Sequence, residues 1–382
     1  MVAAPAAAPV VSAAGAWLAE LAGAPLPGRR VEEWRFTDLS PLTAIAPLLA
    51  PGALHATDVQ LPAGVELLDA AAAAEALDQV VNATGSSAHW PVQLNRAAIA
   101  KGGAGVLALR VRGAVAEPLV LARGLSSSGL EARQLVLVLE PGASLELLQV
   151  VPAGADLEAG AALCALTAVQ LGAGASLRAG VLAQGQPGAS LLAHWLAVQE
   201  PGSEFSLTSA ISGWDLARFE PRVVQSAGAA HTQLRALQAA TAQQISDTHS
   251  FVRFDGPEGT LDQLHKAVAD GQGRSVFNGA VQVPRPAQRT NAAQLSRNLL
   301  LSDRARIDTK PELEIVADDV KCAHGATVSR LREDELFYLQ SRGIAADQAA
   351  VLLKRAFCEE VLRELPAAAA GWNPLAHLLA QA

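Results

Sequence analysis

The stretch that decides the fold is Gly142-Ala143-Ser144-Leu145, because it recurs at Gly174 and Gly188 and, in a looser form, at Gly202. The spacings between successive copies are 32, 14 and 14 residues. A short motif that returns in this way is typical of repeat architectures, in which each unit buries its apolar side against its neighbours.

Around these copies lie short runs in which Leu, Val and Ala alternate with Ser, Gln and Arg, the pattern of short β-strands. Such strands with Gly turns fit a sandwich or a barrel, but the repetition, without Asn-Gly hairpin signals, favours a β-solenoid. The aromatic content of 4% suits a narrow interior of Val, Leu and Ala. The last coil of a solenoid has unpaired backbone groups, so it needs a cap or a partner. The predicted strands cover residues 135–139, 145–150, 165–171, 177–183 and 191–198.

The pattern divides the chain into three zones: a helical region in residues 1–100, a solenoid core in residues 101–328 and a helical domain in residues 329–382. In the first zone, residues 13–22 and 70–81 are predicted helices, and we expect this region to cap the core. The last zone contains an apolar residue at every fourth position of residues 347–365, which predicts an amphipathic helix. The predicted fold is therefore mainly β.

Composition and charge exclude several functions. The 382 residues include 29 basic and 37 acidic ones, and the net charge of −8 argues against a nucleic-acid partner. None of the lysines follows a glycine, so there is no Walker A motif and we expect no nucleotide to bind this chain. No basic residue precedes Arg29, and no apolar run reaches the roughly 20 residues of a membrane helix. We expect a cytoplasmic protein that has no membrane segment.

The three cysteines are too widely spaced for a disulfide framework, which fits a reducing compartment. Cys164 and Cys358 lie in apolar segments and are predicted to be packing residues. Cys322 differs, because it lies two residues before His324 at the end of a β-like run. Alternate strand residues share a face, so the thiol and the imidazole should lie on the same side.

A thiolate beside an imidazole suits iron, zinc or an iron–sulfur cluster, but two ligands are half of a usual site. The remaining ligands would come from elsewhere, including another chain. The alternative is an ordinary strand end with a buried thiol and a hydrogen-bonded imidazole. The preceding Asp318 and Asp319 are predicted to be solvated or turn-forming residues rather than an acid–base pair.

The same stretch resembles the C-terminal part of the SufB/SufD family, the scaffold subunits of the SUF iron–sulfur cluster assembly complex. The similarity continues through Leu336-Phe337-Tyr338-Leu339 and Ser341-Arg342-Gly343-Ile344, and it is most specific across residues 277–344. Where SufB has an acidic His-Glu pattern, this chain has Lys-Cys-Ala-His-Gly, which favours SufD.

The resemblance implies a parallel β-helix core and a noncatalytic scaffold that acts with SufB and with SufC, an ABC-type ATPase. It implies that His324, and Cys322 beside it, hold a nascent iron–sulfur cluster transiently at the SufB interface. It further implies that the C-terminal helices dock SufC, and Phe337, Tyr338 and Arg342 are the expected contacts, since aromatic–Arg clusters are enriched at interfaces. These three residues could instead cement the helices onto the last coil.

Two other classes of function remain open. A β-helix enzyme acting on polysaccharide or acyl substrates would need clustered carboxylates or a catalytic histidine on one solenoid face, and neither is visible. A structural homodimer without metal is harder to exclude. The sequence also leaves open whether the chain forms a homodimer when its partner is missing.

Overall fold

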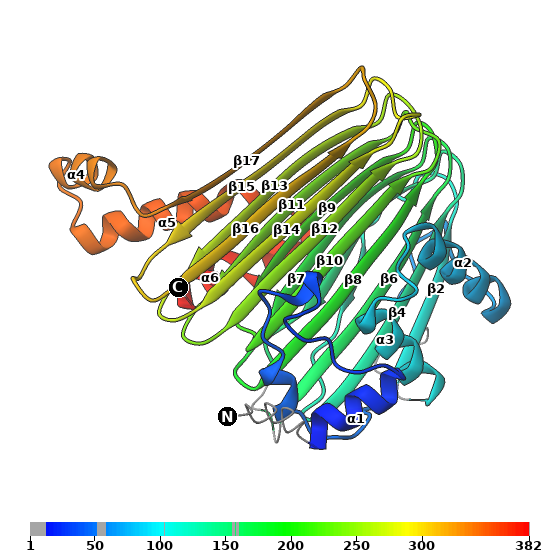
Figure 1. Cartoon of the computed structure of the whole chain (residues 1–382), viewed down its shortest axis with the longest axis horizontal. Coiled ribbons are helices and arrows are strands. Elements are labelled where there is room, and N and C mark those ends of the chain that lie inside the picture. Colours follow the sequence, from blue (N-terminus) through cyan, green and yellow to red (C-terminus); the bar gives the residue numbers. More distant parts are fainter. Residues whose placement is uncertain (1–12, 52–58, 103, 155–156, 158–159, 382) are drawn as a thin grey trace, which may run out of the picture.

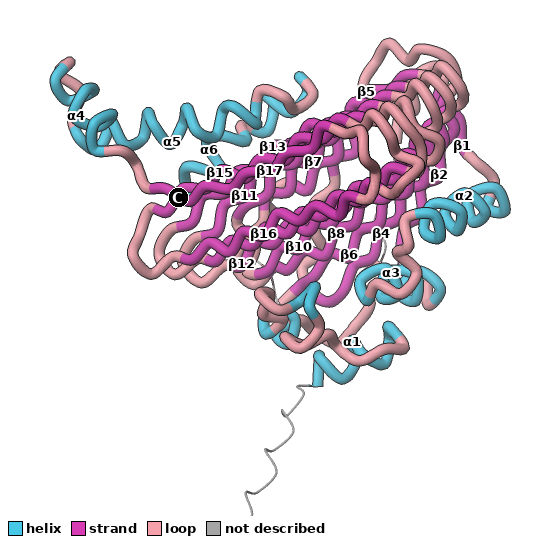
Figure 2. The backbone as a smooth tube through the Cα atoms, turned by 45° about the horizontal axis from the view of Figure 1, so that its top comes forward, coloured by secondary structure: helices cyan, strands magenta, loops and turns pink. Residues whose placement is uncertain are grey.

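The strands stack into two parallel sheets that face each other, so each coil contributes one strand to each sheet (Figures 1 and 2). The computed structural model describes residues 13–51, 59–102, 104–154, 157 and 160–381. The first twelve residues of the predicted helical region lie outside the described residues. The predicted mainly β fold with a parallel β-solenoid core is confirmed.

The even-numbered strands form a nine-stranded sheet with β1 at its edge, and the odd-numbered ones from β3 form an eight-stranded sheet. The nine-stranded sheet contains, in order, β1 (Val65–Leu67), β2 (Ala104–Val111), β4 (Gly129–Leu139), β6 (Ala161–Leu171), β8 (Ala189–Gln199), β10 (Leu216–Gln225), β12 (Ile245–Phe254), β14 (Arg274–Val283) and β16 (Arg306–Ile315). The eight-stranded sheet contains β3 (Leu119–Ala122), β5 (Ser144–Val151), β7 (Ser176–Gln184), β9 (Glu204–Ser212), β11 (His231–Ala240), β13 (Thr260–Ala269), β15 (Asn291–Leu300) and β17 (Lys321–Ser329).

The unequal repeat spacings follow from the two strands in each coil. Gly142, Gly174 and Gly202 precede β5, β7 and β9 of the eight-stranded sheet, whereas Gly188 precedes β8 of the other sheet. A spacing of 14 residues is therefore half a coil, and the spacing of 32 is one whole coil. All four glycines have φ between 66° and 84°, a left-handed conformation that L side chains rarely adopt.

The interior changes from apolar to polar along the solenoid. In the early coils it is lined by side chains such as Leu137, Leu147 and Leu171. In the later coils, buried glutamines are bonded to one another and to serines. Gln263 Nε2 donates to Ser250 Oγ at 2.7 Å, and Gln294 Nε2 donates to Gln263 Oε1 at 2.9 Å. These bonds satisfy polar groups that would be costly to bury alone.

The N-terminal helices, expected from the sequence to cap the core, cover an outer face of the solenoid. Helices α1 (Ala13–Ala22), α2 (Ala70–Ala83) and α3 (Trp90–Ala100) pack on the outer face of the nine-stranded sheet (Figure 1). The apolar residues on that face, among them Leu166, Leu192 and Leu196, are buried by the helices. Two short 3₁₀ turns, η1 (Glu32–Trp34) and η2 (Ser40–Ala44), follow α1.

The C-terminal helices divide into a packed part and a projecting part. Helix α5 (Ala346–Leu362), the turn η4 (Ala367–Trp372) and α6 (Pro374–Gln381) lie against the outer face of the eight-stranded sheet. Helix α4 (Glu333–Ser341) has no buried residue and extends beyond the sheets (Figures 1 and 2). No helix in the described ranges combines the length and the apolar character needed to cross a bilayer.

The two ends of the solenoid differ. At the first end the short strand β1 runs antiparallel to β2. At the other end β16 and β17 are the edge strands of their sheets, and we call this pair the open end. The Arg306 amide donates to the carbonyl of Gly273, just before β14, and the Val316 amide, just after β16, donates to that of Val283, so even-numbered residues of β16 bond inward to the sheet. Pro311, which has no N–H, therefore occupies a position that faces the free edge, where a strand tolerates proline.

Candidate cluster-binding site at the open end

Cys322 and His324 both lie on β17, on the side that faces the solenoid interior. Their register partners on β15 are Ala292 and Gln294, which are buried, and Gln294 bonds within the interior to Gln263. Parallel neighbours in register share a face, so the thiol and the imidazole belong to the interior row. Because no coil follows β17 in the chain, this row is only partly covered at the open end.

The two side chains differ in exposure. Cys322 is half-buried and packs against the interior cluster, whereas His324 is exposed. Burial raises the pKa of the Cys322 thiol and outweighs a backbone contact with Ala292 that lowers it. The free thiol is therefore protonated at neutral pH. A bound metal ion would have to displace that proton before the sulfur could act as a ligand.

The two donors do not make a complete site within this chain. Among the described residues, the one set of three Cys, His, Asp or Glu ligand atoms within 4.8 Å of each other lies elsewhere, on the nine-stranded sheet. Within the described part of the chain, the open end therefore offers two donor side chains without a third ligand atom beside them.

Asp318 and Asp319 lie in the bend between β16 and β17. The Asp319 carbonyl accepts a hydrogen bond from the Arg289 amide, and the Asp319 amide donates to Gln288 Oε1. The backbone of this pair is thus used to stack one turn on the next, as expected of turn-forming residues.

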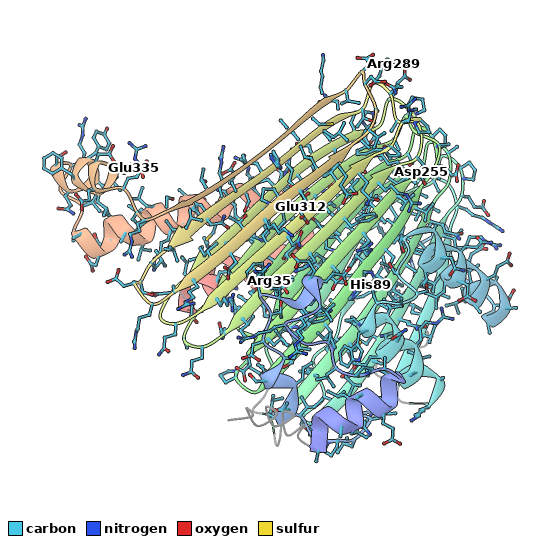
Figure 3. The ribbon with its side chains drawn as sticks, in the orientation of Figure 1. Arg35, His89, Asp255, Arg289, Glu312 and Glu335 are labelled. Carbon is cyan, nitrogen blue, oxygen red and sulfur yellow. The ribbon has the colours of Figure 1, made fainter. Side chains whose placement is uncertain are left out.

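Phe337 and Tyr338 lie on the projecting helix α4 and are 72% and 58% exposed. The Arg342 guanidinium lies 5.3 Å from the centre of the Tyr338 ring, which holds the aromatic and the cation together. Neither aromatic is buried against the last coil, so they do not cement the helices onto it. Glu335 lies on the same projecting helix (Figure 3).

The other two cysteines, and the histidines at 231, 249 and 265, lie apart from the open-end pair and from one another. Cys164 is buried, and burial raises the pKa of its thiol to about 12. Cys358 is also buried, and its thiol pKa is raised to about 11, again mainly by burial. His249 lies in the nine-stranded sheet, whereas His231 and His265 lie in the other, so these histidines form no ladder.

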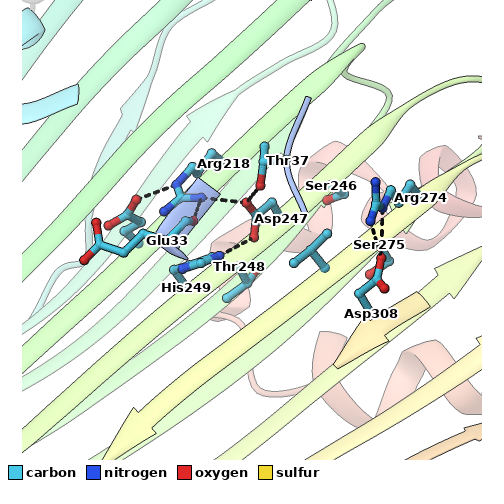
Figure 4. A network of polar contacts seen from close by, with 12 residues as sticks. Glu33, Thr37, Arg218, Ser246, Asp247, Thr248, His249, Arg274, Ser275 and Asp308 are labelled. Atoms are coloured by element: carbon cyan, nitrogen blue, oxygen red, sulfur yellow. Dashed lines mark hydrogen bonds and ion pairs between the residues drawn. The ribbon is translucent and has the colours of Figure 1, made fainter. Parts of the chain in front are cut away.

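Sequence reasoning missed a buried ionic network on the outer face of the nine-stranded sheet. Arg218, 1% exposed, donates from Nε to Glu220 Oε1 at 2.5 Å and from Nη1 to Asp247 Oδ2 at 2.8 Å (Figure 4). Its Nη1 also donates to the Glu33 carbonyl, and its guanidinium lies 3.7 Å from the centre of the Trp34 ring. We call the region around Arg218, Glu220 and Asp247, which Glu33 and Trp34 of the N-terminal region cover, the sealed face.

The network keeps its carboxylates ionised despite burial. Burial alone would raise the pKa of Glu220, but Arg218 and His194 outweigh it and hold the pKa well below its usual range. Burial likewise opposes ionisation of Asp247, and His249 and Arg218 together lower its pKa. The alternation of charged and apolar or small residues in Arg218-Phe219-Glu220 and Asp247-Thr248-His249 was the available signal, but nothing in it showed which segment would cover these charges.

The comparisons with known proteins agree with the fold and the motif. The model for the SufBD core domain of SUF system FeS cluster assembly matches residues 123–357. An iron–sulfur cluster assembly SufBD family protein of Synechocystis is 47% identical over 166 residues, which are 44% of this chain and 37% of that protein. The iron–sulfur cluster assembly protein SufD of Escherichia coli is 38% identical over 133 residues, 35% of this chain and 31% of SufD.

Protein ABCI7 of Arabidopsis thaliana chloroplasts is 44% identical over 165 residues, 43% of this chain and 35% of that protein. The matches thus span about a third of the length of these relatives, whereas the family model covers most of this chain. The matched residues include β17 and α4 with their candidate ligands and aromatics. This chain belongs to the SufBD family of the SUF iron–sulfur cluster assembly system.

Proposed function

We propose that this chain is a noncatalytic scaffold subunit, which holds a nascent iron–sulfur cluster between its open end and a SufB-like partner. A SufC-like ABC ATPase binds its C-terminal helices. The observation that carries this proposal is the interior-facing pair Cys322 and His324 on an edge strand that lacks a following coil.

The geometry of the open end supports the proposal of shared ligation. A partner strand that pairs with the free edge of β17 would continue the interior row and could place its own ligands beside Cys322 and His324. The iron–sulfur cluster is the cargo of this site. The His324 imidazole, already exposed, would supply a nitrogen ligand, and the Cys322 thiol would become a ligand after losing its proton.

The ATPase contact rests on α4. Its exposed Phe337 and Tyr338, with Arg342 beside them, form an aromatic–cation patch of the kind enriched at protein interfaces. Nucleotide-dependent movement of a bound ATPase would act on the open end through the short link between β17 and α4. The result would be a shift between two arrangements of the interface that differ in how well they hold the cluster.

Affinity capture from the native cells tests the assembly. We expect recovery of a second β-helix subunit and an ABC-type ATPase with this chain. The double variant Phe337→Ala/Tyr338→Ala should lose the ATPase and keep the β-helix partner. The matched control is Leu67→Ala, which truncates another exposed apolar side chain, on β1. Capture of the wild-type chain alone under gentle salt would overturn the proposal.

The ligand role is tested with His324→Ala in the assembled complex. We expect the variant to fold and to capture both partners, but to lose the visible absorbance of the assembled cluster. His231→Ala, at another exposed histidine of the same sheet, should leave the absorbance unchanged. Normal cluster assembly by the His324→Ala complex would contradict the assignment.

A further inference from the structure

A second ligand set, unrelated to the open end, lies buried at the sealed face. His89, His194 and Glu220 bring their ligand atoms within 4.8 Å of one another. His89 belongs to the N-terminal region and lies where its helices meet the strands of the nine-stranded sheet (Figure 3). The other two residues belong to β8 and β10, so the set joins two regions of the chain.

The fold fixes each of the three positions. His194 and Glu220 are direct register partners in the β8–β10 ladder, which puts their side chains next to each other on the same face. His89 is the N-cap residue of α3, yet its side chain caps no amide of the helix. Its ring turns instead to the carboxylate of Glu220, whose strand loses its pairing with β12 between Phe219 and Arg222.

The distances fit a metal ion. Glu220 Oε2 lies 3.3 Å from His89 Nδ1 and 3.1 Å from His194 Nε2. In a tetrahedral site with bonds of about 2.0–2.1 Å, ligand atoms are roughly 3.3 Å apart. The two distances from Glu220 to the imidazoles are therefore already close to this value. The third distance, between the ligand nitrogens of the two imidazoles, is at most 4.8 Å.

The nitrogen of His194 that faces the carboxylate makes a close ion-pair contact but no well-aligned hydrogen bond. His194 is 2% exposed, and its Nε2 makes no hydrogen bond within the part of the chain that the structure describes. Its approach to Glu220 Oε2 is close in distance but does not have hydrogen-bond geometry. Buried polar atoms without a partner are rare, and an unplaced ion is one of the standard reasons for them.

The surroundings orient the carboxylate for a ligand role. Arg218 Nε holds Oε1 of Glu220 at 2.5 Å, so Oε2 is the oxygen that faces the two imidazoles. Arg218 is itself fixed by Asp247 and by the Trp34 ring. Such outer partners, which hold a ligand at its position, are a regular feature of metal sites. The His89 side chain is 12% exposed, which leaves a short path from solvent.

We propose that His89, His194 and Glu220 bind one divalent transition-metal ion of the zinc class, which fastens the N-terminal helical region to the solenoid. Two imidazoles and one carboxylate form a donor set for such ions, and water would take the remaining position. This proposal does not depend on the cluster-binding role of the open end.

Calorimetric titration with Zn²⁺ tests the proposal. The sample is the tag-free full-length chain carrying Cys322→Ser and His324→Ala, stripped of metal with a chelator. These two changes remove the open-end ligands, so the result is independent of the proposed function. We expect one saturable site per chain. His89→Gln, at the partly exposed ligand, should weaken binding at least about 100-fold, since even outer partners of metal ligands contribute roughly 10–100-fold.

The matched control is His231→Gln, which removes an exposed imidazole from the other sheet and should leave binding unchanged. Zn²⁺ should also raise the melting temperature of the parent chain and not that of His89→Gln. X-ray absorption should show nitrogen and oxygen at about 2.0–2.1 Å and no sulfur at about 2.3 Å. The absence of a saturable site, equal binding by His89→Gln, or a sulfur shell would overturn the proposal.

Discussion

The sealed face and the open end satisfy their polar groups in opposite ways. At the sealed face Arg218, Glu220 and Asp247 are all buried and are bonded to one another and to the N-terminal segment. At the open end Cys322 and His324 belong to the interior row, but Cys322 is only half-buried and His324 is exposed. The difference suggests a rule: changes at the sealed face should reduce folding stability, whereas changes at the open end should reduce partner binding.

The largest expected effect comes from breaking the sealed face with Arg218→Ala. This change leaves two buried carboxylates without their shared cation, which typically costs about 3–5 kcal/mol. Urea unfolding of the purified chain measures the loss. The control Arg289→Ala removes an exposed arginine paired with Glu258 and should change the free energy of unfolding by less than about 0.5 kcal/mol. Equal effects of the two changes would contradict the comparison.

A pair of proline substitutions on β17 tests the comparison between the sealed face and the open end more closely. The Lys321 amide donates to the Thr290 carbonyl, so the Ala323 amide also faces β15, whereas the Ala326 amide faces the free edge. Ala323→Pro should lower the free energy of unfolding by about 1–3 kcal/mol, because it leaves a ladder acceptor unpaired. Ala326→Pro should leave unfolding unchanged and abolish capture of the β-helix partner. If both variants were destabilised alike, the open end would not be a free edge.

The third effect is a pH dependence that arises in the interior, two coils before the end. Burial lowers the pKa of His265 to about 3, and its ring is stacked on Phe277. The folded chain therefore binds this proton far less readily than the unfolded chain, so stability is lost as pH falls below 6.5 towards 3.

Between pH 6.5 and 5 we expect this imidazole to lower the free energy of unfolding by about 2 kcal/mol. His265→Gln should flatten the dependence over that range, and His231→Gln, at an exposed position, should not. Urea unfolding at a series of pH values measures both. An unchanged slope in His265→Gln would show that the buried imidazole is not the source.

The smallest effect concerns the ion pair that links the N-terminal segment to the edge strand β16. Lys310 on β16 bonds to Glu32 of the N-terminal segment at 2.9 Å, across an exposed surface. The hydrogen bond with Lys310 lowers the pKa of Glu32, and hydrogen bonds with Glu312 and then with Glu32 raise the pKa of Lys310. Lys310→Ala should slightly lower the melting temperature at low salt and leave it unchanged at high salt, because exposed ion pairs are screened.

Much of the solenoid could be predicted because its signals are local. The glycines before β5, β7, β8 and β9 mark turns that any reader of the chain can locate, and the apolar period of residues 347–365 identifies α5. The sequence also brought Cys322 and His324 together, since they lie two residues apart on one strand.

The features that the sequence did not predict depend on contacts between residues far apart in the chain. His89 and Glu220 are 131 residues apart, and no local pattern shows that α3 starts above β10. The sequence likewise did not show which surface the N-terminal helices cover, because this depends on the outward-facing Leu166, Leu192 and Leu196 of distant strands. The direction in which Cys322 points follows from the register with β15, which becomes visible only in the folded chain.

The unlike ends of the solenoid also limit how many copies can join. A stack whose two ends matched could add subunits head to tail without limit and grow into filaments. Here the first end presents the antiparallel strand β1, and the free edge of β16 lacks a donor at Pro311. The sheet of β17 ends on the far side in β3, which has four residues against nine in β17, so a strand that adds at the open end finds no edge of equal length there for the next chain. Assembly through the open end should stop at a pair, which leaves a finite complex instead of a fibre.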